Sequence, residues 1–460
     1  MGAYWRRILD CGRDVQLMLV YALLSFFGLG ITTLIYNLYL VRLGYDEAFI
    51  GAFNAVLTLS MGATCLALGF LINRFGTWTC LIAGAVQFSV TALALAFVTD
   101  GPALLVLAAL NGIGGAFIQT AQMPFVIEWT PERHRATIAA LSSALNSASI
   151  MVGSLVGGLL PGLVGVIANV DGEGAQAFRW TLVVGVVLSL ASITPMLLMG
   201  EARHRPTAAM RMASTQLPDT GTRRNEVRRD LIAVVLIGLF LAFGVGTIEP
   251  FYNVLLEDMG TPTASIGIIF AVSGLITTIA SIGAPPLAQR IGLVSAQVWI
   301  RLMHVPMHLA LIVFPTPAIV SLAYASRRVS GSMGWPLESA HVGGLLPQKA
   351  RPHAFGLRSA SWNFGYAVAA FASGQAIART GSYLPAYISL TVFCILSALV
   401  YVVNYGKRMP PGWERPEAEG AAHVIEATAV APIPTAGSEQ PVMSGEVASS
   451  VDSATQRGTD

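Results

Sequence analysis

The chain has 460 residues, of which 54% are hydrophobic and only 11% are charged. About one quarter of the residues of an average soluble protein are charged. Because so few charged side chains cannot cover a body of this size in water, the composition excludes an ordinary soluble protein and indicates a membrane protein. The net charge of +2 gives no reason to expect nucleic acid as a partner.

Apolar segments long enough to cross a bilayer recur along the whole chain. The first, at 15–41, holds no charged residue; it is too long for a signal-peptide core of about 7–15 residues and long enough for a span of about 20. The following segments are 48–72, 77–98, 102–127, 137–168, 179–199, 231–256, 264–288, 293–314, 316–346, 353–378 and 383–405. The sequence therefore predicts an all-α integral membrane protein with twelve transmembrane helices. Gly331, Gly334 and Pro336 predict a break in the tenth, of the kind found beside a polar cavity.

Basic residues between the spans predict the orientation. One set of alternating segments is rich in Arg and Lys, whereas the opposite set holds only Arg42, Arg179 and Arg379. Since positively charged segments stay on the cytoplasmic side, both termini are expected in the cytoplasm and the chain in the cell inner (plasma) membrane. The four cysteines show no metal-binding or disulfide spacing, and we expect them in the core.

An internal repeat with an offset of 216 residues divides the chain. Tyr36 and Asn37 match Tyr252 and Asn253, and Arg74 matches Arg290. Further glycine matches are Gly44 with Gly260, Gly51 with Gly267, Gly76 with Gly292 and Gly158 with Gly374. A parallel repeat of six spans is typical of two-half transporters. We expect a first half at 1–199, an Arg-rich cytoplasmic linker at 200–230, a second half at 231–408 and a disordered cytoplasmic tail at 409–460.

Two loop motifs carry a resemblance to a known family. Residues 69–76 read G-F-L-I-N-R-F-G and residues 285–292 read P-P-L-A-Q-R-I-G. Both resemble the G-x-L-A-D-R-x-G signature of the major facilitator superfamily. The resemblance implies two six-helix halves related by a pseudo-two-fold axis along the membrane normal, and a cytoplasmic gate that latches the outward-facing state. The gate residues would be Gly69, Asn73, Arg74, Gly76, Glu128, Arg135, Gln289, Arg290 and Gly292.

This gate departs from the family pattern, because Asn73 and Gln289 stand where the signature has an acid. Glu128 could replace that acid as the partner of Arg74 or Arg135, or could be an ordinary solvated helix end. A further motif, G-S-L-V-G-G at 153–158, is similar to an antiporter signature of drug-exporting members, with Ser154 in place of proline. Gly153, Gly157 and Gly158 would then favour export, and close helix packing is the alternative interpretation.

Charges within the spans are expensive in lipid and persist mainly beside a cavity or a partner. Glu249 lies one turn before Asn253, while Arg327, Arg328 and Glu338 lie in the tenth span. In the superfamily the first, fourth, seventh and tenth spans line the pathway. The candidate substrate and proton-coupling residues are therefore Asn37, Gln119, Gln122, Glu249, Asn253, Arg327, Arg328, Trp335 and Glu338.

Several roles stay open at this level. We expect Glu249 or Glu338 to exchange a proton, with Arg327 or Arg328 as its partner. Asn37 and Asn253 could bind substrate or pack the helices, and Trp335 could stack a ring. We expect Arg301, His304 and His308, on one face of the ninth span, to be structural rather than a proton relay.

The predicted function is secondary transport of a small molecule by alternating access, coupled to protons or another ion, with proton-coupled export favoured. Uptake or facilitated passage of an organic anion or a sugar is the alternative. A polytopic membrane enzyme is a remote third, since the scattered histidines form no catalytic or metal-binding motif. We expect no cofactor and no metal, and a monomer in the lipid bilayer.

Overall fold

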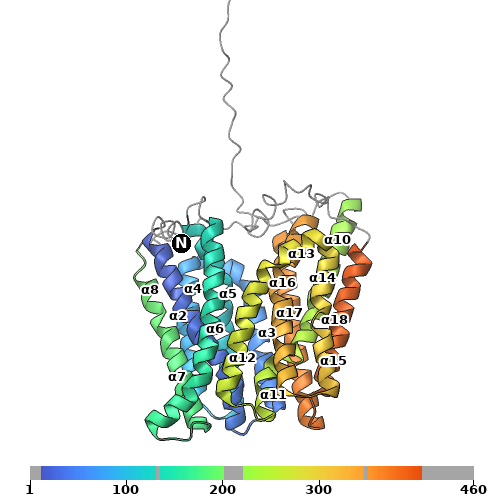
Figure 1. Cartoon of the computed structure of the whole chain (residues 1–460). Coiled ribbons are helices and arrows are strands. Elements are labelled where there is room, and N and C mark those ends of the chain that lie inside the picture. Colours follow the sequence, from blue (N-terminus) through green and yellow to red (C-terminus); the bar gives the residue numbers. More distant parts are fainter. Residues whose placement is uncertain (1–11, 131–134, 201–220, 347–350, 407–460) are drawn as a thin grey trace, which may run out of the picture.

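A computed structural model of the chain describes residues 12–130, 135–200, 221–346 and 351–406, and this part contains helices and no strand. The first group of helices is α2 (Arg13–Arg42), α3 (Glu47–Phe75), α4 (Thr77–Phe97), α5 (Gly101–Trp129), α6 (Arg135–Ala168), α7 (Ala175–Ala191) and α8 (Ile193–Leu197). The second group is α10 (Gly221–Gly246), η2 (Glu249–Phe251), α11 (Tyr252–Asp258), α12 (Thr263–Ile282), α13 (Ala284–Ile291), α14 (Leu293–Leu302), α15 (Val305–Val313), α16 (Pro317–Leu345), α17 (Arg351–Thr380) and α18 (Leu384–Tyr405). The long helices run side by side between two ends of the molecule (Figure 1).

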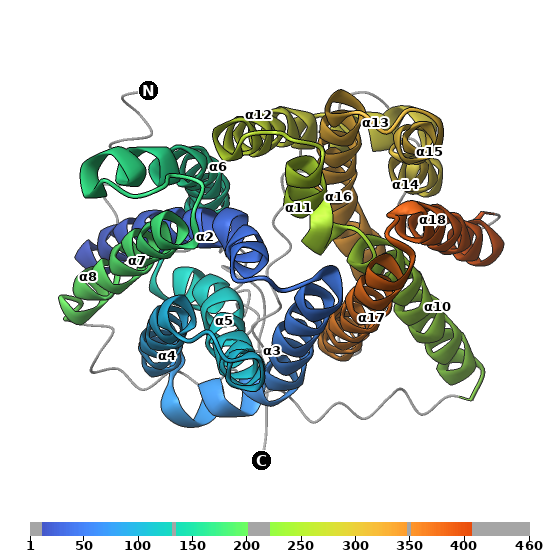
Figure 2. The same cartoon turned by 90° about the horizontal axis from the view of Figure 1, so that it is seen from below.

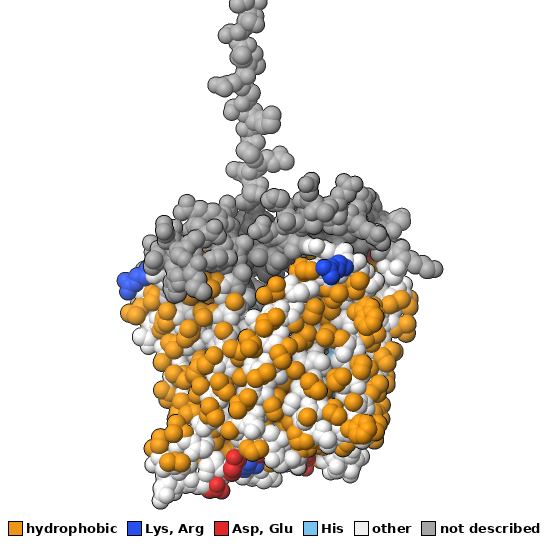
Figure 3. Space-filling model, in the orientation of Figure 1, with side chains coloured by type: hydrophobic (Ala, Val, Ile, Leu, Met, Phe, Trp, Pro, Cys, Tyr) orange, Lys and Arg blue, Asp and Glu red, His pale blue; other side chains and the backbone are white. Residues whose placement is uncertain are grey.

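Ten helical stretches in the described residues are long and apolar enough to cross a membrane. The two other long helices, α16 and α17, have 29 and 30 residues and contain charged side chains described below. A broad band of hydrophobic side chains covers the flank of the molecule, and charged side chains lie at its two ends (Figure 3). This distribution is the one expected of a multi-pass membrane protein, because lipid accepts apolar surface and excludes charge.

The two groups of helices lie side by side, with α2 to α8 on one side and α10 to α18 on the other (Figure 2). They meet where α3 packs along α17 and where α6 packs along α12. Helices α2, α5, α11 and α16 surround the middle of the molecule in the same view. Side chains on the inner faces of these four elements are therefore in position to line a pathway between the groups.

Helix breaks fall at other places than the sequence predicted. The tenth span was expected to break at Gly331, Gly334 and Pro336, but α16 continues through all three. A proline removes only one backbone donor, and the remaining bonds of a long packed helix hold it together. The break lies instead in the seventh span, where α10 ends at Gly246 and the chain passes through η2 into α11. Here Pro250 lacks the N–H group that would continue α10.

The seventh span also begins earlier than predicted, since α10 starts at Gly221 and takes in the end of the Arg-rich segment. Arginine is a good helix former, so the helix extends polar turns beyond the apolar run. The eighth and ninth spans each consist of two helices in series, α12 with α13 and α14 with α15. These interruptions change the helix count without changing the path of the chain across the bundle (Figure 1).

Repeated glycines make equivalent turns in the two groups. Gly44 and Gly260 have φ values of 87° and 77°, and Gly76 and Gly292 have φ values of 85° and 86°. This left-handed region disfavours any residue with a Cβ atom. The final glycine of both gate motifs, at positions 76 and 292, is therefore required by the turn between two helices.

The repeat also determines where the two groups touch. A Cβ atom on Gly51 would lie 3.0 Å from the Gly374 Cα atom, and one on Gly158 would lie 2.7 Å from the Gly267 Cα atom. Because Gly51 is the repeat equivalent of Gly267 and Gly158 that of Gly374, the contacts α3–α17 and α6–α12 are the same contact made twice. Small residues at such crossings let the backbones approach closely.

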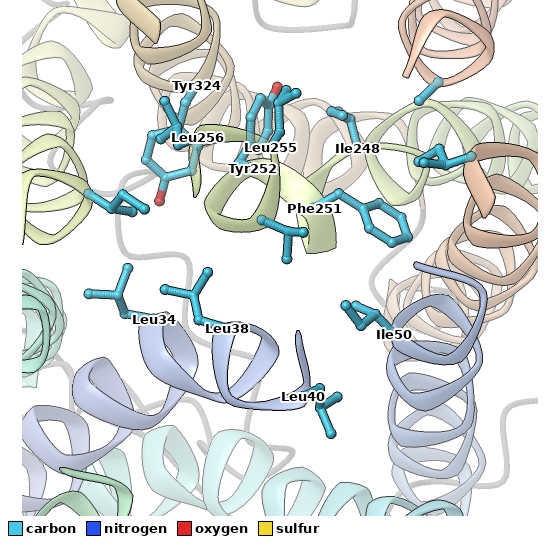
Figure 4. Packing of buried hydrophobic residues seen from close by; sticks show 14 of the residues in the cluster. Leu34, Leu38, Leu40, Ile50, Ile248, Phe251, Tyr252, Leu255, Leu256 and Tyr324 are labelled. Carbon is cyan, nitrogen blue, oxygen red and sulfur yellow. The ribbon is translucent and has the colours of Figure 1, made fainter. Parts of the chain in front are cut away.

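A large hydrophobic core joins the groups toward the lower end in Figure 1, which we call the Arg42 end after the residue that closes α2. Leu34 and Leu38 of α2 face Phe251, Tyr252 and Leu255 of the second group across this core (Figure 4). The opposite end, where α3 ends near Arg74, is called the Arg74 end. Buried apolar area thus holds the two groups together at the Arg42 end.

Candidate functional site

A first cluster of charges connects the break in the seventh span to α16. Glu249 of η2 lies 3.6 Å from Arg327 and 4.0 Å from Arg328, measured between carboxylate oxygens and guanidinium nitrogens. Arg327 is 8% exposed, yet its Nε atom has no hydrogen-bond partner among the described residues, and the same holds for Glu249 Oε2. Buried polar groups are normally paired. This cluster, next to the core at the Arg42 end, therefore has free hydrogen-bonding capacity.

A second cluster joins α14, α16 and α17. Glu338, which is 3% exposed, accepts a 2.8 Å hydrogen bond from Arg301 and a 2.5 Å bond from Arg358. Arg301 is held further by Gln297 and by Ser397 Oγ, and its guanidinium lies over the Tyr401 ring at 4.7 Å. Each carboxylate oxygen of Glu338 is engaged by a different arginine. Breaking such a buried network leaves charges unpaired in a low dielectric, which makes it a structural joint of the second group.

Trp335 contacts the second cluster. Its side chain lies on α16, and the Arg358 guanidinium lies 4.2 Å from its ring centre. Trp335 is nevertheless 55% exposed. Residues seven apart on a helix share a face, so Trp335 lies on the same face of α16 as Arg328, about 10 Å further along at 1.5 Å per residue.

The first group contributes uncharged polar groups. Gln119 on α5 and Thr33 on α2 are exposed. Gln122 is buried instead; its amide donates to Ser142 Oγ and exchanges hydrogen bonds with Asn146, both on α6. Of the predicted pair on α5, the structure therefore leaves Gln119 free to meet a ligand and uses Gln122 to join α5 to α6.

Asn37 and Asn253 form reciprocal bonds between the groups. Asn37 Nδ2 donates to the Pro250 carbonyl and Asn253 Nδ2 donates to the Leu34 carbonyl, both at 2.7 Å. Leu34 and Pro250 are themselves equivalent in the 216-residue repeat, so the two bonds are related by the pseudo-two-fold axis. Of the two roles left open by the sequence, these bonds correspond to helix packing near the Arg42 end.

Polar groups at the Arg42 end reinforce this contact. Arg42 forms ion pairs with Glu257 of α11 and with Glu173, whose carboxylate also accepts a 3.1 Å bond from Thr263. Tyr383 Oη donates to Asp258 at 2.7 Å and lies 3.5 Å from Glu47 of the first group. Burial, followed by the nearby charge of Asp258, raises the pKa of Tyr383 above its usual range, so the phenol remains a donor.

At the Arg74 end, by contrast, side chains of the two gate motifs are exposed. Arg74 and Arg290 of the two gate motifs are exposed, as is Gln289, and neither arginine forms an ion pair with another described residue. Arg74 lies over the ring of its neighbour Phe75 at 5.5 Å. Gly69 lies within α3. The side chains of Asn73, Glu128 and Arg135 lie outside the described residues, so the predicted partnership of Glu128 stays a prediction.

The glycines of the 153–158 motif lie where helices meet. A Cβ atom on Gly153 would lie 2.2 Å from the Phe27 carbonyl oxygen, and one on Gly157 would lie 3.1 Å from the Ile31 Cα atom, both on α2. Gly158 meets Gly267 of α12, and Ser154 Oγ donates to the Gly30 carbonyl. Close packing against two helices therefore accounts for this motif without reference to the direction of transport.

Sequence reasoning placed Arg301, His304 and His308 on one face but assigned them no partners. In the structure His308 Nε2 lies 2.6 Å from Tyr252 Oη, and His304 Nε2 lies 3.4 Å from Cys394 Sγ. Arg358 was missed as a site residue. The rule that drew attention to Glu338, a charge inside an apolar span, applies equally to Arg358 in the eleventh span and would have found it.

The fold and the site together define a membrane transporter built of two repeat-related halves. Its helices meet on symmetric glycine contacts, and such transporters place their sites at the interface between the halves. A family model described as Major Facilitator Superfamily matches residues 18–327. The chain therefore belongs to the major facilitator superfamily, and this family indicates a transporter rather than an enzyme.

Solved structures agree with this fold. A crystal structure of a mutant of the nucleoside transporter NupG superposes with a TM-score of 0.66 at 15% sequence identity, covering 85% of this chain and 100% of the other. The structure of NupG itself gives a TM-score of 0.64 at 13% identity, covering 85% and 99%. At these identities the likeness concerns the fold alone. No curated protein matches the sequence.

Proposed function

We propose that the chain couples the movement of a small molecule to protons, that it works by alternating access between its two halves, and that Glu249 is the coupling acid. The observation that carries the proposal is the difference between the two glutamates. Glu249 lies 3.6–4.0 Å from its arginines and has a free buried oxygen, whereas Glu338 is hydrogen-bonded on both oxygens. A coupling acid must be able to exchange its partner for a proton.

The physical cycle follows from that geometry. When Glu249 is ionised, it attracts Arg327 and Arg328 and neutralises part of their charge. When it takes up a proton, this attraction ends and the two guanidinium groups become available to other partners. Because Glu249 lies at the break between α10 and α11, a change in its pairing acts on the segment that also carries Asn253. Protonation is thereby connected to the contact between the halves.

Orientation and location belong to the same proposal. We place the Arg74 end in the cytoplasm of the cell and the protein in the inner membrane, because Arg74 and Arg290, which belong to the segments expected inside, lie at that end. The Arg42–Glu257 ion pair and a shared core join the halves at the Arg42 end, so the conformation described here would be closed toward the outside. Transport then requires a second conformation in which the Arg42 end opens.

The test uses proteoliposomes with a pH gradient and a trapped pH dye. Lipophilic cations, organic anions, sugars and nucleosides are added in turn to the parent, Glu249→Gln and Glu249→Asp proteins. We expect one class to dissipate the gradient with the parent and with Glu249→Asp, which keeps a titratable carboxylate. Glu249→Gln is expected to reduce proton flux to that of protein-free liposomes while still exchanging labelled substrate.

The same experiment decides between the two directions that the sequence left open. Proton movement in the same direction as the added compound shows cotransport, and movement in the opposite direction shows export by exchange. Undiminished proton flux in Glu249→Gln contradicts the assignment of Glu249. Exchange without any proton movement in the parent protein would identify a facilitator and contradict the coupling.

A further inference from the structure

The charges around the pathway do not balance. The two clusters on α16 contain the arginines 301, 327, 328 and 358 but only the glutamates 249 and 338. With ordinary ionisation they carry an excess of two positive charges, one in each cluster. The pathway residues of the first half, among them Thr33 and Gln119, are uncharged. Uncompensated charge within a membrane is costly and is retained where a ligand or partner of opposite sign arrives.

The excess charge is accessible at one position in particular. The Arg328 side chain is 40% exposed and its distance to Glu249 is at the limit of an ion pair. Arg327 behind it is nearly buried and has an unpaired Nε atom. A guanidinium group binds carboxylate or phosphate groups through paired hydrogen bonds. The pair Arg327 and Arg328 therefore fits an anionic group on a ligand.

Trp335 adds a second element of recognition on the same helix face. One side of its indole ring is covered by Arg358, while about half of the side chain is exposed. A planar ring can stack on the free side. Because the arginine behind the indole attracts its π electrons, a cation on the free side would be repelled and a neutral or anionic ring preferred.

These two elements lie about 10 Å apart along α16. We infer that the substrate of this transporter is a planar aromatic anion, with its ring on Trp335 and its anionic group toward Arg328 and Arg327. The inference rests on the proposed function and specifies its substrate class. Protonation of Glu249 would free the arginines for the anion, so proton and anion would be bound together and carried in the same direction.

The test is binding of four matched compounds to the purified full chain in lipid nanodiscs, by isothermal titration calorimetry. 2-Naphthoate has both the ring and the charge. Decahydro-2-naphthoate keeps the charge and loses the planar ring, 2-naphthylmethanol keeps the ring and loses the charge, and 2-naphthylmethylammonium reverses the charge. We expect 2-naphthoate to bind tighter than each of the others by on the order of tenfold or more.

Variants at two positions separate the contributions of the ring and of the charge. Trp335→Ala is expected to abolish the preference for 2-naphthoate over its saturated counterpart, and Trp335→Phe to keep it. Arg328→Gln is expected to abolish the preference for the anion over the neutral alcohol. Trp299→Ala on α14 and Arg379→Gln at the end of α17 remove an exposed tryptophan and an exposed arginine elsewhere, and both should retain the parent preferences.

The inference is overturned by equal binding of the cation and the anion, by equal binding of the saturated and planar acids, or by absence of binding of all four to folded protein. A preference that survives both Trp335→Ala and Arg328→Gln overturns it as well. The proposed function fails separately. If the protein binds 2-naphthoate with these preferences but moves no protons, the substrate class stands and the proton coupling fails. If only a sugar causes proton movement, the proton coupling stands and the substrate class fails.

Discussion

At the scale of single residues, the most informative pair is Asn37 and Asn253. Both were noticed because they repeat, and repetition alone did not tell substrate binding from packing. Their side chains donate to carbonyls of the opposite half at 2.7 Å. A net hydrogen bond contributes on the order of 1 kcal/mol, and two such bonds at the Arg42 end favour the conformation in which that end is closed.

Asn37→Ala or Asn253→Ala should therefore open the Arg42 end more often. Each change is expected to remove about 1 kcal/mol from the closed state, which is about a fivefold shift in the conformational equilibrium. The measurement is the rate at which a membrane-impermeant maleimide labels a cysteine placed at Leu38, in protein whose own cysteines are replaced by serine. Leu38 is fully buried between the halves.

The two substitutions should act alike, because the repeat makes their bonds equivalent. Asn404→Ala serves as the control, since its amide bonds the Val400 carbonyl within α18, and its labelling rate should equal the parent rate. Unchanged labelling in both interface variants would show that the reciprocal bonds do not bias the equilibrium.

At the scale of helices, the second half depends on the joint that Glu338 makes with Arg301 and Arg358. These side chains come from α16, α14 and α17, and the triad lies beside a small apolar cluster that includes Ile300 of α14 and Leu337 of α16. Removing one partner of a buried ion triad lowers the stability of a protein much more than replacing all three, because one missing partner leaves an uncompensated charge.

Glu338→Gln is accordingly expected to destabilise the protein by about 3–5 kcal/mol. The measurement is the free energy of unfolding in mild detergent, followed by tryptophan fluorescence against a denaturant. The combined change Arg301→Met, Glu338→Leu and Arg358→Met removes all three charges and should recover most of the loss. A triple variant as unstable as Glu338→Gln would show that shape at this joint, rather than charge, determines stability.

Glycines also allow helices to pack closely where they cross, away from the turns. Gly51 and Gly158 lie at the two crossings between the halves, and a side chain at either would meet backbone atoms. Gly153 and Gly157 serve the same purpose between α6 and α2. A motif that resembles an antiporter signature is thereby explained by backbone distance, which is a property shared by importers and exporters.

At the scale of the whole molecule, the two groups of helices are joined unevenly. The ion pairs of Arg42, the Asn37 and Asn253 bonds and the large core all lie toward the Arg42 end. Arg74 and Arg290 at the other end are exposed. Two bodies held at one end can exchange that contact for one at the other end by rocking.

Spin labels can detect this motion without knowledge of the substrate. One pair is placed at the Arg42 end, on Gln176 and Leu384, and another at the Arg74 end, on Leu198 and Ser295; each pair joins one half to the other. On transfer from neutral to acidic buffer, pulsed electron resonance is expected to show the first distance lengthening and the second shortening.

A control pair within one half, Gln176 with Asp46, should keep its distance in both buffers, because each half moves as a unit. Distances that change with the same sign at both ends would contradict rocking, and so would a change within the control pair.

The sequence by itself determined the class of this protein. Composition and apolar length identified a membrane protein, because a span is a continuous apolar segment of the chain. The 216-residue repeat predicted two equivalent halves, because it is read by comparing the sequence with itself. The same repeat matched Gly76 with Gly292, and the turns that both glycines make depend only on local backbone conformation. The same offset of 216 residues places Gly51 and Gly267 in equivalent positions, and likewise Gly158 and Gly374.

Only the tertiary structure decided which of these groups meet. Gly51 contacts Gly374 rather than its own repeat equivalent, Glu338 pairs with arginines 37 and 20 residues away, and Glu249 keeps an unpaired oxygen. Packing keeps α16 continuous through Pro336, whereas Pro250 interrupts the seventh span, and the sequence alone does not tell which proline breaks its helix. Pairing between distant residues depends on where the helices cross. The sequence of a helix shows which of its residues share a face, but it does not show which other helix packs against that face. Glu249 and Glu338 therefore looked alike in the sequence and differ in the folded chain.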